Sequence, residues 1–319
     1  MVAQEFVQAS RRREGWRVAG RVLGTVAFVA ILVFIAPVSD WVDSMRTARP
    51  LPVLIGISVV LLLGVLEATR LLVLARLPRA EVGPATHLVF AASCVAHLPF
   101  GFVGSDVYRA AGLRRMGTPT GASLGVVAAA RTLGLGATLL ATCGGALWAL
   151  STGADAVDGS LRRLGAVSAV LLVLVVVLTI AAAWLGRTAI AQRRTPGWLR
   201  QVGHALGEVR GGVLLTSAGL SVAIAIVRVA VVFACAAALR AEVSVAAAVV
   251  ATGTGVVASV VPSILGGVGP QEAGLAGALL LFDVDPAAAV VVALLSRAVS
   301  LGGAVVGYGL SWPFRRAHG

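Results

Sequence analysis

The sequence predicts an all-α membrane protein, a helical bundle that crosses the bilayer several times. Of its 319 residues, 58% are hydrophobic and only 13% are charged, whereas a soluble domain carries about 25% charged residues. The mean hydropathy is +0.95. Long apolar segments, sufficient for helices that cross a hydrocarbon core of about 30 Å, recur along the chain. The sequence lacks the alternation of apolar and polar residues over about ten positions that is typical of barrel strands.

The long apolar segments define the expected crossings in order. A basic arm, residues 1–16, precedes the first segment. Because that segment is long and no small-residue cleavage pattern follows it, we interpret it as a retained helix and not as a signal peptide. Residues 17–312 then form one transmembrane domain, followed by a short tail, 313–319. The expected crossings are 17–37, 52–75, 120–150, 164–186, 212–239 and 286–312.

Two shorter apolar regions, 85–98 and 245–262, each run into a stretch of proline and glycine. All 26 basic residues are arginine, and the positive-inside rule places the arginine clusters on both sides of 85–98 in the cytoplasm. This region and the short segment after it therefore make no net crossing. We predict a re-entrant helical hairpin, or two very short crossings. The same reasoning predicts a second hairpin that enters from the outer face, with both termini in the cytoplasm.

The two hairpin regions resemble each other. The first reads His97-Leu-Pro-Phe-Gly-Phe-Val-Gly-Ser-Asp106, and the second reads Val261-Pro-Ser-Ile-Leu-Gly-Gly-Val-Gly-Pro-Gln-Glu272. Each acid is followed 25 residues later by an arginine in a long apolar helix, Arg131 or Arg297. The units 52–150 and 212–312 enter from opposite faces, so they form an inverted repeat. Secondary transporters with this architecture bind substrate at their broken helices.

The pattern Pro-x(3)-Gly-Gly-x-Gly-x-x-Glu at Pro262 to Glu272 also carries a family resemblance. Together with the stretch Pro-Phe-Gly-Phe-Val-Gly-Ser-Asp-Val-Tyr-Arg and the arginine in the last helix, it resembles the lysylphosphatidylglycerol synthase transmembrane, or flippase-like, family. The resemblance covers roughly 15–315. Bifunctional members join this bundle to a soluble aminoacyltransferase, whose lipid product the bundle is thought to flip. We expect that domain to be absent here, because the sequence stops at Gly319, and the resemblance then implies lipid movement and not lipid synthesis.

The acids and arginines inside the apolar segments are the candidate substrate-binding groups. Charges in the middle of a membrane helix cost about 2.5–3.5 kcal/mol on insertion scales, so few are retained without a partner or a purpose. Asp106 and Glu272 are expected to open short helices, either as helix caps or as acids in a cavity. Arginine suits a lipid phosphate because its fork donates two parallel hydrogen bonds. A structural ion pair with the acids is the alternative for these arginines, which are Arg131, Arg228 and Arg297.

Other polar residues complete the candidate site. Glu67 and Arg70 are three residues apart on one helix and can form a local ion pair, which could also serve in coupling transport to an ion. Alternatively, the Arg70 side chain could extend along the helix so that its charge reaches the membrane interface. Gln271 stands beside Glu272. The glycines could present amides to an anion or simply form a turn; they are Gly266, Gly267 and Gly269. His87 and His97 are expected to be polar packing groups, so no metal site is predicted.

The leading functional hypothesis is a lipid flippase or related transporter for a phospholipid or polyprenyl-phosphate-linked lipid. The alternative is a membrane enzyme, or an accessory subunit of one, that modifies lipids or cell-envelope glycolipids. We find no catalytic constellation and no nucleotide-binding loop, so we expect no enzyme activity and no cofactor. The expected partners are anionic or phosphate-bearing membrane lipids, with a lipid synthase or glycosyltransferase as a possible protein partner and no nucleic acid.

Overall fold

A computed structural model describes residues 37–98, 101–151, 211–259 and 269–315, together with a few residues near 30 and 170. Every regular element in these ranges is a helix. Four helices are long and apolar enough to span a membrane, and their ends match four predicted crossings to within two residues. They are α3 (Pro50–Ala75), α6 (Thr120–Ser151), α10 (Gly211–Ala238) and α13 (Pro286–Ser311). The all-helical fold class is confirmed; the predicted crossings 17–37 and 164–186 lie almost entirely outside the described residues.

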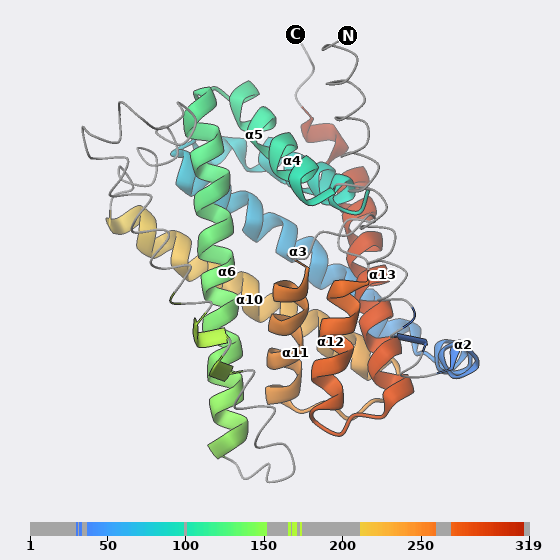
Figure 1. Cartoon of the computed structure of the whole chain (residues 1–319). Coiled ribbons are helices and arrows are strands. Elements are labelled where there is room, and N and C mark those ends of the chain that lie inside the picture. Colours follow the sequence, from blue (N-terminus) through green and yellow to red (C-terminus); the bar gives the residue numbers. More distant parts are fainter. Residues whose placement is uncertain are drawn as a thin grey trace, which may run out of the picture.

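Four shorter helices form two antiparallel-looking pairs at opposite ends of the bundle (Figure 1). The first pair is α4 (Val82–Ala96) with α5 (Gly101–Arg115), and the second is α11 (Val245–Ala258) with α12 (Pro270–Leu280). At about 1.5 Å per residue, none reaches the length of a full crossing. The remaining elements are short: α2 (Val38–Arg46), η1 (Arg79–Glu81) and η3 (Trp312–Phe314).

Local signals in the sequence fix several helix ends. Pro50 and Pro286 stand at the first turns of α3 and α13, where a missing N–H costs nothing. The Asp285 carboxylate accepts a hydrogen bond from the Ala288 N–H at 2.9 Å, and Ser244 caps α11 in the same way. α3 ends at Arg76, which adopts a left-handed conformation.

The long helices form the frame against which the pairs pack. α3 crosses α10, and both contact α6 and α13. The α4/α5 pair packs on α3, α6 and α13, whereas the α11/α12 pair packs on α6, α10 and α13.

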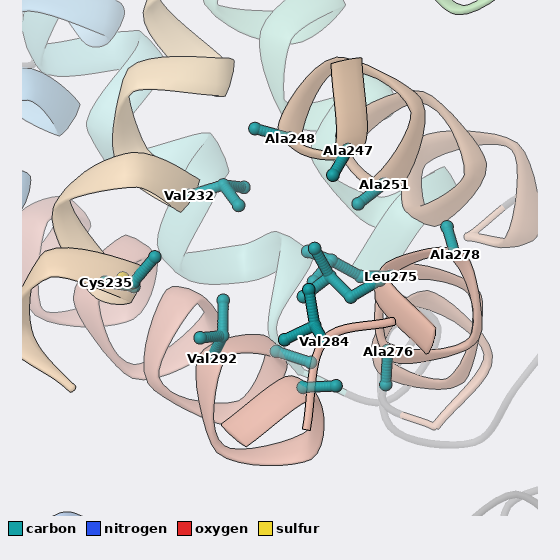
Figure 2. Close-up of a cluster of buried hydrophobic side chains, with 14 of the residues drawn as sticks. Val232, Cys235, Ala247, Ala248, Ala251, Leu275, Ala276, Ala278, Val284 and Val292 are labelled. Atoms are coloured by element: carbon teal, nitrogen blue, oxygen red, sulfur yellow. The ribbon is translucent and has the colours of Figure 1, made fainter. Parts of the chain in front are cut away.

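Two apolar clusters hold the bundle together, one around each helical pair. Figure 2 shows the larger one, where alanines of α11 and α12 face valines of α10 and α13. Small side chains let helix backbones approach closely, which is how helices associate in lipid. Gly274 likewise lets α12 approach α11 closely, because a Cβ at this position would lie 2.8 Å from the Cβ of Ala258. The second cluster joins α3, α4, α5 and α6.

Candidate functional site: an arginine-lined cavity

A cavity of about 600 Å³ lies between the two apolar clusters. Its wall includes the end of α4, the start of α5, the end of α11 and the start of α12, so the inner ends of both helical pairs meet there. The residues from these four ends are Ala96, His97, Ser105, Val256, Ser259 and Gln271. The helical pairs therefore bring segments that are far apart in the sequence to one site.

The described lining of this cavity is strongly positive in charge. In the described part of the chain, one acid, Glu67, lines it, against four arginines: Arg70, Arg109, Arg131 and Arg228. They come from α3, α5, α6 and α10. We call these four residues the arginine cluster. Guanidinium groups retain their charge under almost all conditions and can donate up to five hydrogen bonds each. The described lining of the cavity therefore carries a net positive charge, which favours an anion.

Glu67 joins three helices. Arg109 Nη2 donates to Glu67 Oε2 at 3.0 Å, and Arg228 Nη2 donates to Glu67 Oε1 at 2.9 Å. The Glu67 side chain is only 9% exposed, so its charge needs such partners. It faces inward because it continues the buried stripe of α3 that includes Val60, Gly64 and Leu71.

Arg70 is almost fully buried, at 5% exposure, and does not snorkel. Its Nη1 donates to Ser221 Oγ of α10 at 3.1 Å, while its Nε has no hydrogen-bond partner within the described ranges. Gly134 of α6 makes room for the guanidinium, because a Cβ there would lie 3.1 Å from Nη1. The expected ion pair between Glu67 and Arg70 is not the pairing found: Glu67 binds arginines of other helices, and Arg70 binds a neutral serine.

Asp106 pairs with Arg131 of α6, and this pair is open. Arg131 Nε lies 2.9 Å from Asp106 Oδ2 and 3.1 Å from Oδ1. The side chains are 38% and 30% exposed for Arg131 and Asp106, respectively. α5 has already begun by Gly101, and Asp106 lies beyond its first turn. The expectation that Asp106 opens a short helix, as a cap, is therefore wrong, because that helix begins earlier than the acid.

Glu272 pairs with Arg297 of α13, and this pair is closed. Glu272 Oε2 accepts the Gly269 N–H at 2.6 Å, so this acid does cap its helix. Arg297 Nη1 donates to Gln271 Oε1 at 2.9 Å and lies 3.4 Å from Glu272 Oε1. The Glu272 side chain is 2% exposed and that of Arg297 is 14% exposed. Of this group, Gln271 is the residue that lines the cavity.

The glycine prediction is only partly within the described residues. Gly269 has φ +100, a conformation that side chains rarely adopt, at the start of α12. Its N–H is occupied by Glu272. Gly266 and Gly267 lie outside the described residues, and their anion-binding role stays a prediction.

Three contributors to the site were not singled out from the sequence: Arg109, Ser221 and Gly134. The positive-inside rule instead places Arg109 in the cytoplasm, with the neighbouring Arg114 and Arg115. The signal available for the other two was weak, namely small residues in long apolar helices opposite a buried charge. Within the described ranges, no group of histidine, cysteine and acid side chains could hold a metal ion. His87 stacks on Tyr308 with ring centroids 4.9 Å apart.

Comparison with known families agrees with this architecture. The family model described as the lysylphosphatidylglycerol synthase TM region matches residues 21–307. The chain belongs to this family. No curated protein matches it. The match covers both helical pairs and the four long helices except the last residues of α13, so the arginine-lined cavity lies inside the matched region. The family is one of multi-pass membrane proteins involved in lipid handling.

Proposed function

We propose that this protein is a lipid flippase, which moves a phosphate-bearing lipid between the two leaflets of the cell membrane. The observation that carries the proposal is the excess of arginine over acid in a cavity between the ends of two short helical pairs. An anionic headgroup that enters an apolar bundle needs such compensation, because an unpaired charge there is very costly. The arginine cluster supplies it along the headgroup's path, while the acyl chains remain in the surrounding lipid.

The packing of the helices supports an inverted repeat as the framework for this movement. α4 packs on α13 as α11 packs on α6, and α3 contacts α13 as α10 contacts α6. Exchanging the unit α3–α6 with the unit α10–α13 thus preserves the pattern of contacts. In the proposed topology, the protein has six crossings and two re-entrant hairpins, with both termini cytoplasmic. Opposed hairpins whose inner ends share a cavity are suited to alternating access.

The cavity residues take different parts in the proposed mechanism. Arg131 and Arg228 are about one-third exposed, and they first meet the lipid phosphate. In the resting protein these arginines pair with the carboxylates of Asp106 and Glu67, and they exchange these partners for the phosphate when the lipid enters. Glu272 and Arg297 are closed to the cavity and serve to hold α12 on α13. The proposal includes no enzymatic step.

Transfer of labelled lipid in proteoliposomes tests the proposal. Purified protein is reconstituted with a phosphate-bearing lipid whose headgroup or chain carries a fluorophore that dithionite bleaches only in the outer leaflet. We expect the wild-type protein to expose inner-leaflet label far faster than protein-free vesicles do. Arg228→Gln removes one charge-assisted hydrogen bond, so its rate should fall by roughly tenfold.

Arg46→Gln is the matched control, because Arg46 is 77% exposed on α2, away from the cavity. Its rate should equal that of the wild type. Wild-type protein that leaves the label as protected as empty vesicles do would refute transport. Recovery of a covalently altered lipid from the purified protein would support the enzyme alternative instead.

A further inference from the structure

Among the described residues at the cavity, the positive and negative charges do not balance. Among the described residues, Asp106 offsets Arg131, and Glu67 is shared by Arg109 and Arg228. Arg70 has the neutral Ser221 as its hydrogen-bond partner. Arg70, Arg109 and Arg228 thus carry three positive charges against the single negative charge of Glu67, with histidine counted as neutral. An excess of two positive charges is left in a membrane interior.

Unused hydrogen-bond donors accompany this excess of charge. The Nε groups of Arg70 and Arg109 are buried and have no hydrogen-bond partner among the described residues. Buried donors are normally satisfied, so each orphan indicates a missing acceptor or water. Arg70 is 95% removed from solvent and lines the cavity. In the part of the chain that the structure describes, the same region therefore has too little negative charge and too few hydrogen-bond acceptors for its arginines.

We propose that the cavity selects lipids whose headgroup carries about two negative charges, such as a phosphomonoester or diphosphate, over phosphodiester, zwitterionic and aminoacylated lipids. This inference deepens the proposed function and rests on it for the statement that the ligand is a lipid. A phosphomonoester has a charge of about −1.5 to −2 at pH 7 and three strong acceptor oxygens. It matches the excess of two charges and can accept from several guanidinium groups at once.

A phosphodiester headgroup offers only one negative charge and fewer free oxygens, so it leaves part of the excess uncompensated. An aminoacyl headgroup is a worse fit, because it adds an ammonium group that needs an acid. In the described part of the cavity, Glu67 and the neighbouring Asp106 already hold arginines. The charge balance of this chain therefore favours a more anionic lipid than the one in the family's descriptive name.

Equilibrium binding to the purified full chain in neutral detergent tests this selectivity. The probes share dioleoyl chains and differ in headgroup: phosphatidic acid, phosphatidylglycerol, lysylphosphatidylglycerol and phosphatidylcholine. We expect phosphatidic acid to bind roughly tenfold more tightly than phosphatidylglycerol and the other two to bind more weakly still. Inorganic phosphate is added as a competitor and should displace the lipid only at concentrations far above the lipid's Kd.

Variants of Arg70 connect the selectivity to the excess charge. Arg70→Gln removes one of the two excess charges and should reduce the preference for phosphatidic acid over phosphatidylglycerol to about threefold or less. Arg70→Lys retains the charge and should retain most of the preference. Ser221→Ala removes the neutral partner of Arg70 without changing the charge, so the preference should also persist. Thermal unfolding of each variant checks that a reduced preference for phosphatidic acid does not come from a loss of folded protein.

Several results would overturn the proposal. Equal affinity for phosphatidic acid and phosphatidylglycerol would do so, as would tighter binding of lysylphosphatidylglycerol. A preference that persists unchanged in folded Arg70→Gln would contradict the role of the excess charge. Inorganic phosphate that binds as tightly as the lipid would contradict a lipid ligand. Selective binding without transfer between leaflets refutes the flippase alone, whereas transfer without headgroup selectivity refutes this inference alone.

Discussion

The two acid–arginine pairs look alike in sequence but have different environments. Both have a spacing of 25 residues, and each joins a short helix to the long helix that follows. The Asp106–Arg131 pair is about one-third exposed and lies beyond the first turn of its helix. The Glu272–Arg297 pair is nearly sealed, and Glu272 also caps its helix. We therefore propose that the repeated motif serves binding in the first copy and structure in the second.

The largest expected effect of disrupting either pair is on the free energy of unfolding. Arg297→Gln leaves the Glu272 carboxylate buried without its charge partner, which should cost about 3 kcal/mol. Arg131→Gln breaks an open pair and should cost about 1 kcal/mol or less. Thermal or denaturant unfolding in detergent measures both. Equal destabilisation by the two variants would contradict the contrast between a closed and an open pair.

The next largest effect is on lipid transfer, where Arg131→Gln should have the larger effect and Arg297→Gln the smaller one. Arg131→Gln removes a cavity donor that we assign to the phosphate, so transfer in proteoliposomes should slow by roughly tenfold. Arg297→Gln, assayed below its unfolding temperature and corrected for folded protein, should stay within about threefold of the wild type. If Arg297→Gln transferred lipid more slowly than Arg131→Gln, the binding site would have to lie at the Glu272–Arg297 pair instead.

A smaller change of opposite sign is expected from the acids. Asp106→Asn removes the carboxylate that offsets Arg131, which raises the positive charge at the cavity by one. The affinity for phosphatidic acid should therefore rise by roughly fivefold. Glu272→Gln should leave this affinity nearly unchanged and lower the unfolding temperature instead. Titration of both variants with the same lipid compares them, and weaker binding by Asp106→Asn would show that this acid contacts a cationic group.

The smallest effect comes from displacing Arg70 without changing any charge. In Gly134→Ala, the new Cβ would lie 3.1 Å from Arg70 Nη1, and the flexible side chain must move by a few tenths of an ångström. We expect a loss of about twofold in phosphatidic acid affinity. Gly136→Ala, in the same helix, is the control because nothing lies within 4 Å of its Cβ. Equal affinities of the two variants would show that the position of Arg70 does not affect binding.

Much of the fold follows from the sequence because its signals are local. Hydropathy locates the long helices, and the distribution of arginine predicts that the two shorter regions make no net crossing. The network around Glu67 is different. It joins residues 42 and 161 positions apart, and no periodicity within one helix predicts which helices face each other.

The prediction for Glu67 and Arg70 fails for this reason. A spacing of three residues allows a pair along one helix, but buried charges take the partners with the best geometry, and neighbouring helices supply these. The different environments of Asp106 and Glu272 are equally hidden, since they depend on where each short helix begins. The shared spacing of 25 residues contains no information on that point.

The most direct test of the central claim compares lipid transfer by Arg131→Gln and Arg297→Gln in the same proteoliposome assay, at equal amounts of folded protein. We expect wild-type protein to transfer a phosphomonoester lipid far faster than protein-free vesicles do. Arg131→Gln should be roughly tenfold slower than the wild type, and Arg297→Gln should remain close to it. Equal rates in all three proteins, or a loss confined to Arg297→Gln, would contradict transport through the arginine-lined cavity.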